Sequence, residues 1–381
     1  MDFTLSEDLT ELKKDVIQFA RKKLNEGFRE REKSSQFNWN GWKECAEYGL
    51  QGMPLPEEYG GLGMDILSCL MAMEGLGYAC QDSGLIFALN THLWTCEMPI
   101  LKFGNEDQKG RYLPSLVRGE MIGGHAMTEA DSGSDAFSMR TKAEKTGNGY
   151  LLNGTKMFIT NAPVADLLII FAVTDRSKRF AGISAFLVER GTPGLEFSKP
   201  IEKLGLKTSP LGEVILTDCE VPESALLGCV GLGSAIFNSE MEWERSCLFA
   251  THLGAMERLL EDSVRYSRER KQFGQQIGQF QGVSHKIADM KMNLEVGRLM
   301  LYKVAIMKKD GRRAPLESAI AKLFISEKYV EASLAAMQIH GAYGYTTEFD
   351  IERHLRDSVA GTIYSGSSEI QRNIIASMLG L

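Results

Sequence analysis

The 381-residue sequence is poor in the residues that build covalent or metal frameworks. Its seven cysteines are odd in number, scattered and never part of a Cys-x-x-Cys pair. Its six histidines are equally dispersed, with no metal-ligand spacing. These patterns argue against a disulfide framework and a zinc site, so we expect reduced thiols and no metal.

Long apolar runs and a charge excess of one sign are also missing. No run approaches the roughly 18 residues that a membrane span needs. The start, Met1-Asp-Phe-Thr, lacks the basic and apolar regions of a secretion signal, so a cytoplasmic protein is expected. The net charge of −7 is spread over interspersed charges, which gives no basic stripe for nucleic acid or anionic lipid. Gly231-Leu-Gly233 lacks the third glycine and the βαβ context of a dinucleotide loop.

One stretch, residues 122–222, reads as β-structure. Short apolar runs such as Leu167-Leu-Ile-Ile-Phe-Ala-Val are separated there by Gly, Asn, Asp and Pro. Helical periodicity fills both flanks. The sequence therefore predicts an α+β protein with helical residues 1–121, a central β domain at 122–228 and a helical bundle at 229–381. The expected helices cover 4–35, 66–80, 83–103, 106–118, 231–269, 280–310, 315–340 and a last segment from about 367.

Several polar stretches suit a ligand with phosphates. The loop Met127-Thr-Glu-Ala-Asp-Ser-Gly-Ser-Asp135 offers backbone N–H groups and hydroxyls, although an ordinary surface loop has the same composition. Arg270 near a helix end fits a phosphate or is a solvated cation. The glycines of Gln338 to Tyr345 leave room for a close approach. Ser365-Gly-Ser-Ser before Glu369 is a helix cap and a place for an anion.

These motifs resemble those of the acyl-CoA dehydrogenase family of flavoenzymes, and they occur in the same order along the chain. The resemblance covers nearly the whole chain. It implies the fold of that family: an N-terminal helical domain, a central β-barrel domain and a C-terminal four-helix bundle. It also implies FAD bound between subunits of a homotetramer or dimer. The matching motifs are Pro56-Glu-Glu-Tyr-Gly-Gly-Leu-Gly, Met127-Thr-Glu with Gly133-Ser-Asp, Lys156-Met-Phe-Ile-Thr-Asn161, Arg270-Lys-Gln-Phe-Gly, Gly341 to Gly344 and Ile363 to Arg372.

The resemblance assigns the FAD contacts residue by residue. Phe158 stands where the family usually has Trp, which keeps an apolar ring face but loses the indole N–H. The group at 270–281 is expected to reach the FAD of a neighbouring subunit. The implied FAD contacts are Met127, Thr128, Gly133, Ser134, Phe158, Thr160, Arg270, Gln272, Phe273, Phe280, Gln281, Gln338, Gly341, Ser367 and Glu369.

The catalytic base departs from the usual family pattern. Most members carry Glu after the Tyr of Ile-Tyr-x-Gly, where this chain has Ser365. A minority place the base one residue before an Arg on the helix that opens the C-terminal domain, and here that residue is Glu244, followed by Arg245. Glu242 lies about 200° away around the helix, so only one of the two should face the flavin. A surface carboxylate paired with Arg is the alternative for Glu244.

Further matches resemble a subgroup that oxidises a prolyl group held as a thioester on a peptidyl or acyl carrier protein in natural-product biosynthesis. They include Met1-Asp-Phe, Asn90-Thr-His-Leu93, Asn161-Ala-Pro-Val-Ala-Asp166 and Trp243-Glu. The resemblance implies that Glu244 removes the proton α to the thioester, that the Ser365 N–H binds the developing enolate, and that hydride goes to FAD. Burial should raise the pKa of Glu244. The expected substrate contacts are Ser134, Trp243, Arg245, Ser365, Gly366, Thr91 and Thr95.

Three functions stay open: carrier-tethered prolyl dehydrogenase or oxidase, short-chain acyl-CoA dehydrogenase using Glu244, and non-redox flavin-binding scaffold. A wet pocket lined by Thr91, His92 and Thr95 would suit a polar substrate, with a buried, satisfied His92 and core-packed Trp243 as the alternatives. Basic docking of the carrier is expected at Arg245, Arg312 or Arg313. The electron acceptor is either oxygen or an electron-transfer flavoprotein.

Overall fold

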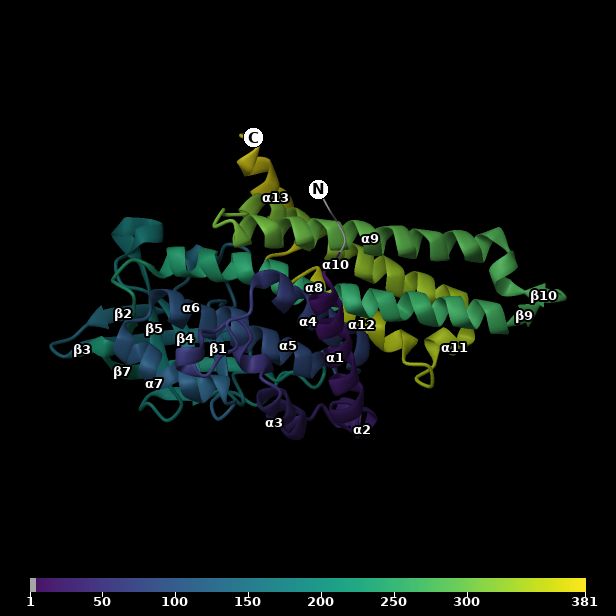
Figure 1. Cartoon of the computed structure of the whole chain (residues 1–381). Coiled ribbons are helices and arrows are strands. Elements are labelled where there is room, and N and C mark those ends of the chain that lie inside the picture. Colours follow the sequence, from purple (N-terminus) through teal and green to yellow (C-terminus); the bar gives the residue numbers. More distant parts are fainter. Residues whose placement is uncertain (1–4) are drawn as a thin grey trace.

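The protein is described here by a computed structural model covering residues 5–381. The resemblance at Met1-Asp-Phe therefore lies outside the described residues. Helices occupy both ends of the chain and a sheet occupies the middle (Figure 1). The predicted central β region between two helical regions is thus confirmed. Within residues 5–381, no helix is long and apolar enough to cross a membrane.

The α4 helix packs between α1 and α8, so it is almost entirely buried. The predicted helix over 4–35 is instead two helices, α1 and α2, because the chain turns at Gly27 with φ +64°. Glycine adopts that left-handed conformation without the penalty other residues meet. The bounds are α1 Glu7–Lys23, α2 Phe28–Ser34, α3 Trp39–Glu47, α4 Ile66–Ala79, α5 Ser83–His92, a π-helical turn η3 Leu93–Glu97, α6 Met98–Phe103 and α7 Glu106–Val117.

The central strands wrap around one apolar cluster to which β2 through β7 all contribute side chains. The strand order is β6-β7-β3-β2-β4-β5-β8, with β1 parallel to β4. In β4, alternate residues enter this inner cluster and an outer one that packs on α7 and α8, which explains its uninterrupted apolar run. The bounds are β1 Gly123–Ala126, β2 Lys142–Lys145, β3 Gly149–Thr160, β4 Leu167–Val173, β5 Ile183–Glu189, β6 Leu195–Phe197, β7 Leu211–Pro222 and β8 Leu226–Leu227.

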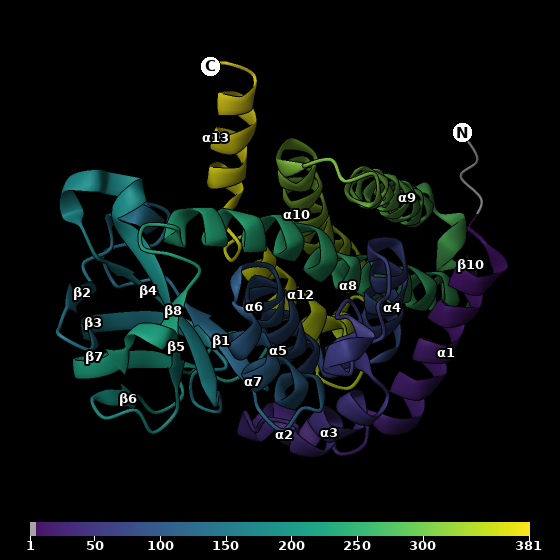
Figure 2. The same cartoon turned by 60° about the vertical axis from the view of Figure 1, so that its left-hand side comes forward.

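The C-terminal region is a bundle built on α8, whose first half lies beside the sheet and whose second half runs with α9 and α10 (Figures 1 and 2). α4 crosses α8 so closely that a Cβ on Gly77 would lie 2.0 Å from the Thr251 carbonyl. The sequence did not predict α12. The bounds are α8 Gly233–Glu269, β9 Lys271–Gln272, β10 Gln275–Gln276, α9 Gln281–Lys309, α10 Pro315–His340, α11 Ala342–Tyr345, α12 Ile351–Gly361 and α13 Ser368–Met378.

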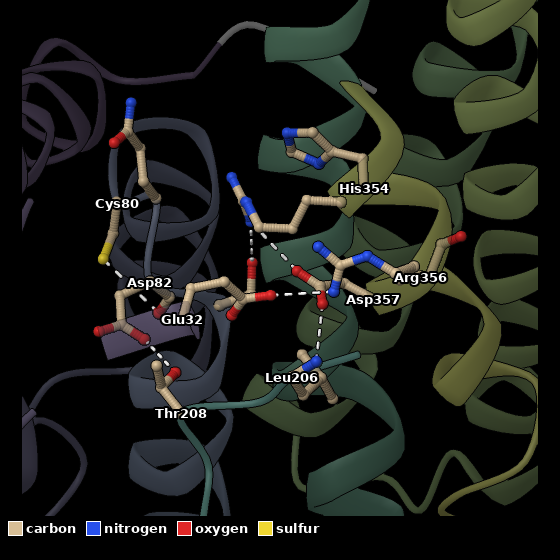
Figure 3. Close-up of polar contacts among 12 residues, drawn as sticks. Glu32, Cys80, Asp82, Leu206, Thr208, His354, Arg356 and Asp357 are labelled. Carbon is tan, nitrogen blue, oxygen red and sulfur yellow. Dashed lines mark hydrogen bonds and ion pairs between the residues drawn. The ribbon is translucent and has the colours of Figure 1, made fainter. Parts of the chain in front are cut away.

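A buried polar network joins the three regions at α12 (Figure 3). Asp357 accepts the Leu206 N–H at 2.7 Å and pairs with Arg353 at 3.1 Å. Arg356 reaches Glu32 of α2 at 2.9 Å, and Thr208 donates to Asp82 ahead of α5. These contacts tie α12 to α2 through Glu32 and to the loop after β6 through Leu206.

Candidate active site

Three carboxylates of α8, at positions 240, 242 and 244, meet different surroundings. Glu242 pairs with Lys308 at 3.0 Å and accepts the Ala314 N–H at 2.9 Å, on the bundle side. Glu244 lies on another face and forms no ion pair with any residue from 5 to 381. The two residues therefore face apart, as the helical geometry predicted.

The Glu244 side chain is buried, with 6% of the residue exposed. Burial raises the pKa of its carboxyl, and the charges of His125 and Arg245 only partly offset that effect. The Ser365 hydroxyl is close enough to lower the pKa somewhat, yet it makes no hydrogen bond of regular geometry. A buried carboxylate with a raised pKa and no committed partner has the properties of a general base.

The turn facing Glu244 is held in a strained conformation. Ser365 has φ +56° and Gly366 has φ +88°. Arg245 Nε donates to the Ser365 carbonyl at 3.0 Å, and Gln371 Nε2 donates to the carbonyls of Ser365 and Gly366 at 3.1 and 2.9 Å. No acceptor within residues 5–381 takes the Ser365 N–H. Left-handed backbone at a non-glycine residue costs about 1–3 kcal/mol and recurs at functional sites.

The turn Met127-Thr128-Glu129 is fixed to β3 by a buried lysine. Lys156, fully buried, donates from Nζ to the Met127 carbonyl at 3.0 Å and to Glu129 at 2.9 Å. Burial opposes ionisation of Glu129, but Lys156 and the N–H groups of residues 140 and 141 outweigh it and lower the pKa of Glu129. This turn is therefore a rigid platform that leaves Thr128 half-exposed.

An aromatic ring stands exposed beside that platform. Phe158 is 54% exposed at φ +59°, at a register shift in β3, and Thr160 follows it half-exposed. Gly133 and Ser134 are exposed on the adjacent loop, where a Cβ on Gly133 would meet nothing within 4 Å. An open apolar ring beside hydroxyls suits a flat ligand with a polar rim.

A second group of predicted residues lies at the far tip of the bundle. Arg270 follows Glu244 by 26 positions, which is about 39 Å at the helical rise. Arg270 is exposed there, and Phe273 is 93% exposed. Tyr266 stacks on His340, with ring centroids 4.3 Å apart, which brings the end of α10 to the same tip. This tip cluster comprises Arg270, Gln272, Phe273, Phe280, Gln281, Gln338 and Gly341.

The prediction of a wet pocket lined by Thr91, His92 and Thr95, on α5 and η3, is wrong. Thr91 and Thr95 are buried, and their hydroxyls donate to the carbonyls of Phe87 and Thr91, one turn back. His92 is fully buried, accepts the Gly123 N–H at 2.9 Å and sits 3.0 Å from Glu97. These polar atoms are satisfied inside the fold, so they line no polar cavity.

Two further expectations change. Arg245 is only partly exposed and is bound to the Ser365 turn, so it positions that turn and does not offer a docking surface. Trp243 stacks on buried Trp94 with centroids 6.0 Å apart, beside Lys308, which fits its core-packing alternative. Ser367 caps α13, and Glu369 is exposed in its first turn.

Two residues at the site were not predicted. His125 of β1 and Glu240 of α8 form a 2.8 Å contact between Nδ1 and Oε1. Glu240 lies one helical turn before Glu244. The sequence carries no spacing signal for this pair, because 115 residues separate its members.

Comparisons with known proteins cover all three regions. Family models for the N-terminal, middle and C-terminal domains of acyl-CoA dehydrogenase match residues 6–120, 124–219 and 231–380. An L-prolyl-[peptidyl-carrier protein] dehydrogenase of Serratia sp. is 41% identical over 100% of this chain and 99% of its own.

Two solved structures are also similar. The prolyl acyl carrier protein oxidase AnaB has a TM-score of 0.98 at 49% identity, covering 99% of this chain and 100% of its own. PigA with FAD and proline has a TM-score of 0.98 at 40% identity, covering 100% of both chains.

Proposed function

The chain belongs to the acyl-CoA dehydrogenase family, and from that premise we propose that it oxidises a prolyl group held as a thioester on a carrier protein, with FAD as cofactor. One observation carries the catalytic part: Glu244 is a buried carboxylate without an ion-pair partner within residues 5–381, and it faces a strained turn with a free N–H. The similarity to prolyl-carrier enzymes supports the substrate.

The residues present fit FAD. The exposed Phe158 ring offers an apolar face, and Thr128 and Thr160 offer hydroxyls at its side. The Met127 carbonyl is already taken by Lys156, so the platform is rigid before any ligand arrives. We assign the isoalloxazine end to this site, with Gly133, Ser134, Ser367 and Glu369 towards the phosphates or the pantetheine arm.

Within this proposal, the chain's own residues handle one proton and one developing charge. Glu244 accepts the proton α to the thioester, and its raised pKa makes it a stronger base than an exposed carboxylate. The free Ser365 N–H donates to the carbonyl oxygen as negative charge develops there. Arg245 and Gln371 hold that N–H in place through the carbonyls of the turn. FAD, when bound, supplies the two-electron acceptor.

We assign the tip cluster to a neighbouring subunit's cofactor. Arg270 and Phe273 are exposed about 39 Å from Glu244 along α8, too far to serve the same flavin. α9 also exposes Met292, Leu299 and Ile306, which are 50–57% exposed and spaced by seven residues along one stripe. We therefore propose a homo-oligomer, in agreement with the expected tetramer. We also propose that the chain divides into three domains, at 1–121, 122–228 and 229–381, and that it acts in the cytoplasm in natural-product biosynthesis.

Flavin reduction by a loaded carrier protein tests the function. The FAD-bound protein is mixed anaerobically with L-prolyl carrier protein, and absorbance near the flavin maximum is followed. We expect bleaching with wild type and a loss of about 10²- to 10⁴-fold in rate for Glu244→Gln, which keeps the shape but not the proton acceptor. Glu242→Gln is the matched control, because Glu242 faces Lys308.

Two results would contradict the proposal. Near-normal reduction by Glu244→Gln would reject the base. Bleaching by butyryl-CoA but not by the prolyl carrier would leave an acyl-CoA dehydrogenase in its place. The same experiment with oxygen or an electron-transfer flavoprotein as the final acceptor identifies the electron acceptor.

A further inference from the structure

Two titratable residues near Glu244, His125 and Glu240, have no role in the proton transfer proposed above. His125 and Glu240 form a buried acid–imidazole pair, with 2.8 Å between Nδ1 and Oε1. The Glu240 side chain is fully buried, and its second oxygen, Oε2, has no hydrogen-bond partner among residues 5–381. Burying a carboxylate with one unpaired oxygen costs free energy, because no hydrogen bond replaces those that the oxygen made to water.

The pair lies close to Glu244. Phe237, Glu240 and Glu244 lie at i, i+3 and i+7 on α8, so they share one face. Glu244 acts electrostatically on both His125 and Glu240. Only the imidazole has access to open space, since 21% of the His125 side chain is exposed and none of Glu240 is. His125 thus forms the reachable end of the pair, with Nε2 free of protein partners in the described chain.

The imidazole is held rigidly. Its ring lies parallel to Phe237, with 6.3 Å between centroids and 9° between planes, and edge-on to Phe171 at 6.3 Å. Glu240 fixes Nδ1, so Nε2 keeps one direction. His125 also lies two residues before Met127, near the end of β1.

The charges around the pair favour proton exchange near neutrality. Burial works against a charged His125, but Glu240, and more weakly Glu244, outweigh it and raise its pKa, while Lys156 of β3 opposes them. Burial raises the pKa of Glu240 to about 7, and His125 partly opposes the rise. Glu240 also acts on the Cys96 thiol of η3, whose pKa burial raises well above its usual value.

We propose that the His125–Glu240 pair recognises the ring nitrogen of the prolyl substrate and takes its extra proton. The proposal deepens the function above and rests on it. A prolyl thioester carries a secondary ammonium, whereas a plain acyl thioester carries only carbon at that position. Glu244 takes the α-proton, so a second polar group is needed for a ring with nitrogen, and none is needed for a ring without it.

The proton step balances without a further reactant. The N–H bond of the ammonium breaks, its electron pair stays on nitrogen, and a new bond forms from the proton to His125 Nε2. The imidazolium is stabilised by Glu240 through the Nδ1 hydrogen. Nothing is oxidised or reduced in this step. The ring nitrogen is then neutral and carries a free lone pair.

A substrate of the same shape without the ring nitrogen distinguishes recognition of that nitrogen from a general loss of activity in the variants. Wild type, His125→Gln and Glu240→Gln, each loaded with FAD, are compared on carrier protein bearing L-prolyl or cyclopentanecarbonyl groups. We expect the prolyl-to-cyclopentanecarbonyl ratio of flavin-reduction rates to fall about 10²-fold in both variants. His285→Gln, an exposed histidine on α9, is the matched control and should leave the ratio unchanged. An unchanged ratio in both site variants overturns the inference.

Binding by wild type alone gives a second readout that depends on no variant. Calorimetry compares a prolyl-pantetheine amide with its cyclopentanecarbonyl analogue, after correction for the separately measured pKa of the ligand amine. Affinity for the prolyl ligand, relative to the analogue, should rise about tenfold as pH increases through about 7 and the pair becomes able to accept a proton. A ratio independent of pH overturns the inference. Failure of wild type to react with prolyl carrier defeats the proposed function itself, a result separate from either ratio.

Discussion

Replacing Lys156 by Met should destabilise the protein strongly, because the substitution leaves a carboxylate without its counter-ion. The Lys156 side chain is fully buried, and that of Glu129 is 8% exposed. Removing one member of a buried ion pair costs about 3–5 kcal/mol, mainly through the charge left behind. Loss of the 3.0 Å bond to the Met127 carbonyl adds about 1 kcal/mol. We expect Lys156→Met to lower the free energy of unfolding by about 4–6 kcal/mol.

Urea denaturation followed by circular dichroism measures this loss, and a double variant tests its cause. Lys156→Met with Glu129→Gln removes both charges, so it should recover most of the loss. Lys145→Met is the matched control, because Lys145 and Glu223 are half-exposed or more and solvent screens their pair. The reasoning is refuted if Lys156→Met unfolds like wild type, or if the double variant is no more stable than the single one.

Three further outcomes are expected. Arg270→Ala should reduce FAD affinity about 10- to 100-fold, because one Arg–phosphate contact contributes that much. Flavin retention on gel filtration measures the loss, and Arg265→Ala, at another exposed arginine, is the control. Asp357→Ala should cost about 3–5 kcal/mol in urea denaturation, since it strands the buried Arg353 and the Leu206 N–H; wild-type stability would show that the pair is dispensable. The rate of flavin reduction should fall with decreasing pH at a point above 4.5, because burial raises the pKa of Glu244; an acid limb near 4.5 would contradict this.

Local pattern was sufficient for much of the fold. The uninterrupted apolar run of β4 is buried on both faces, and the run predicted a strand for that reason. The long helices at 233–269, 281–309 and 315–340 match their predicted spans closely, since helical periodicity over that length has few alternatives. Local pattern also separated Glu242 from Glu244, because their angular offset follows from the helix alone.

Features set by tertiary contacts were not visible in the sequence. Thr91 and Thr95 are polar, which suggested a wet pocket, yet a threonine in a helix satisfies its hydroxyl on the preceding turn and needs no water. The α12 helix is held by contacts to distant segments, such as that of Arg356 with Glu32, which a local pattern does not reveal. The His125–Glu240 contact arises only when β1 meets α8, and no spacing rule encodes it.

The three carboxylates of α8 show how environment divides one residue type into different roles. Glu242 meets Lys308 and the Ala314 N–H, and these partners hold its pKa below the usual value despite burial. Glu240 is fully buried against an imidazole, and burial raises its pKa to about 7. Glu244 meets no ion-pair partner among residues 5–381 and faces the strained Ser365 turn. Glu242 is therefore a structural carboxylate held by its ion pair. Glu240 shares a proton with His125 and can exchange it, and Glu244, without an ion-pair partner, is available to act as a base.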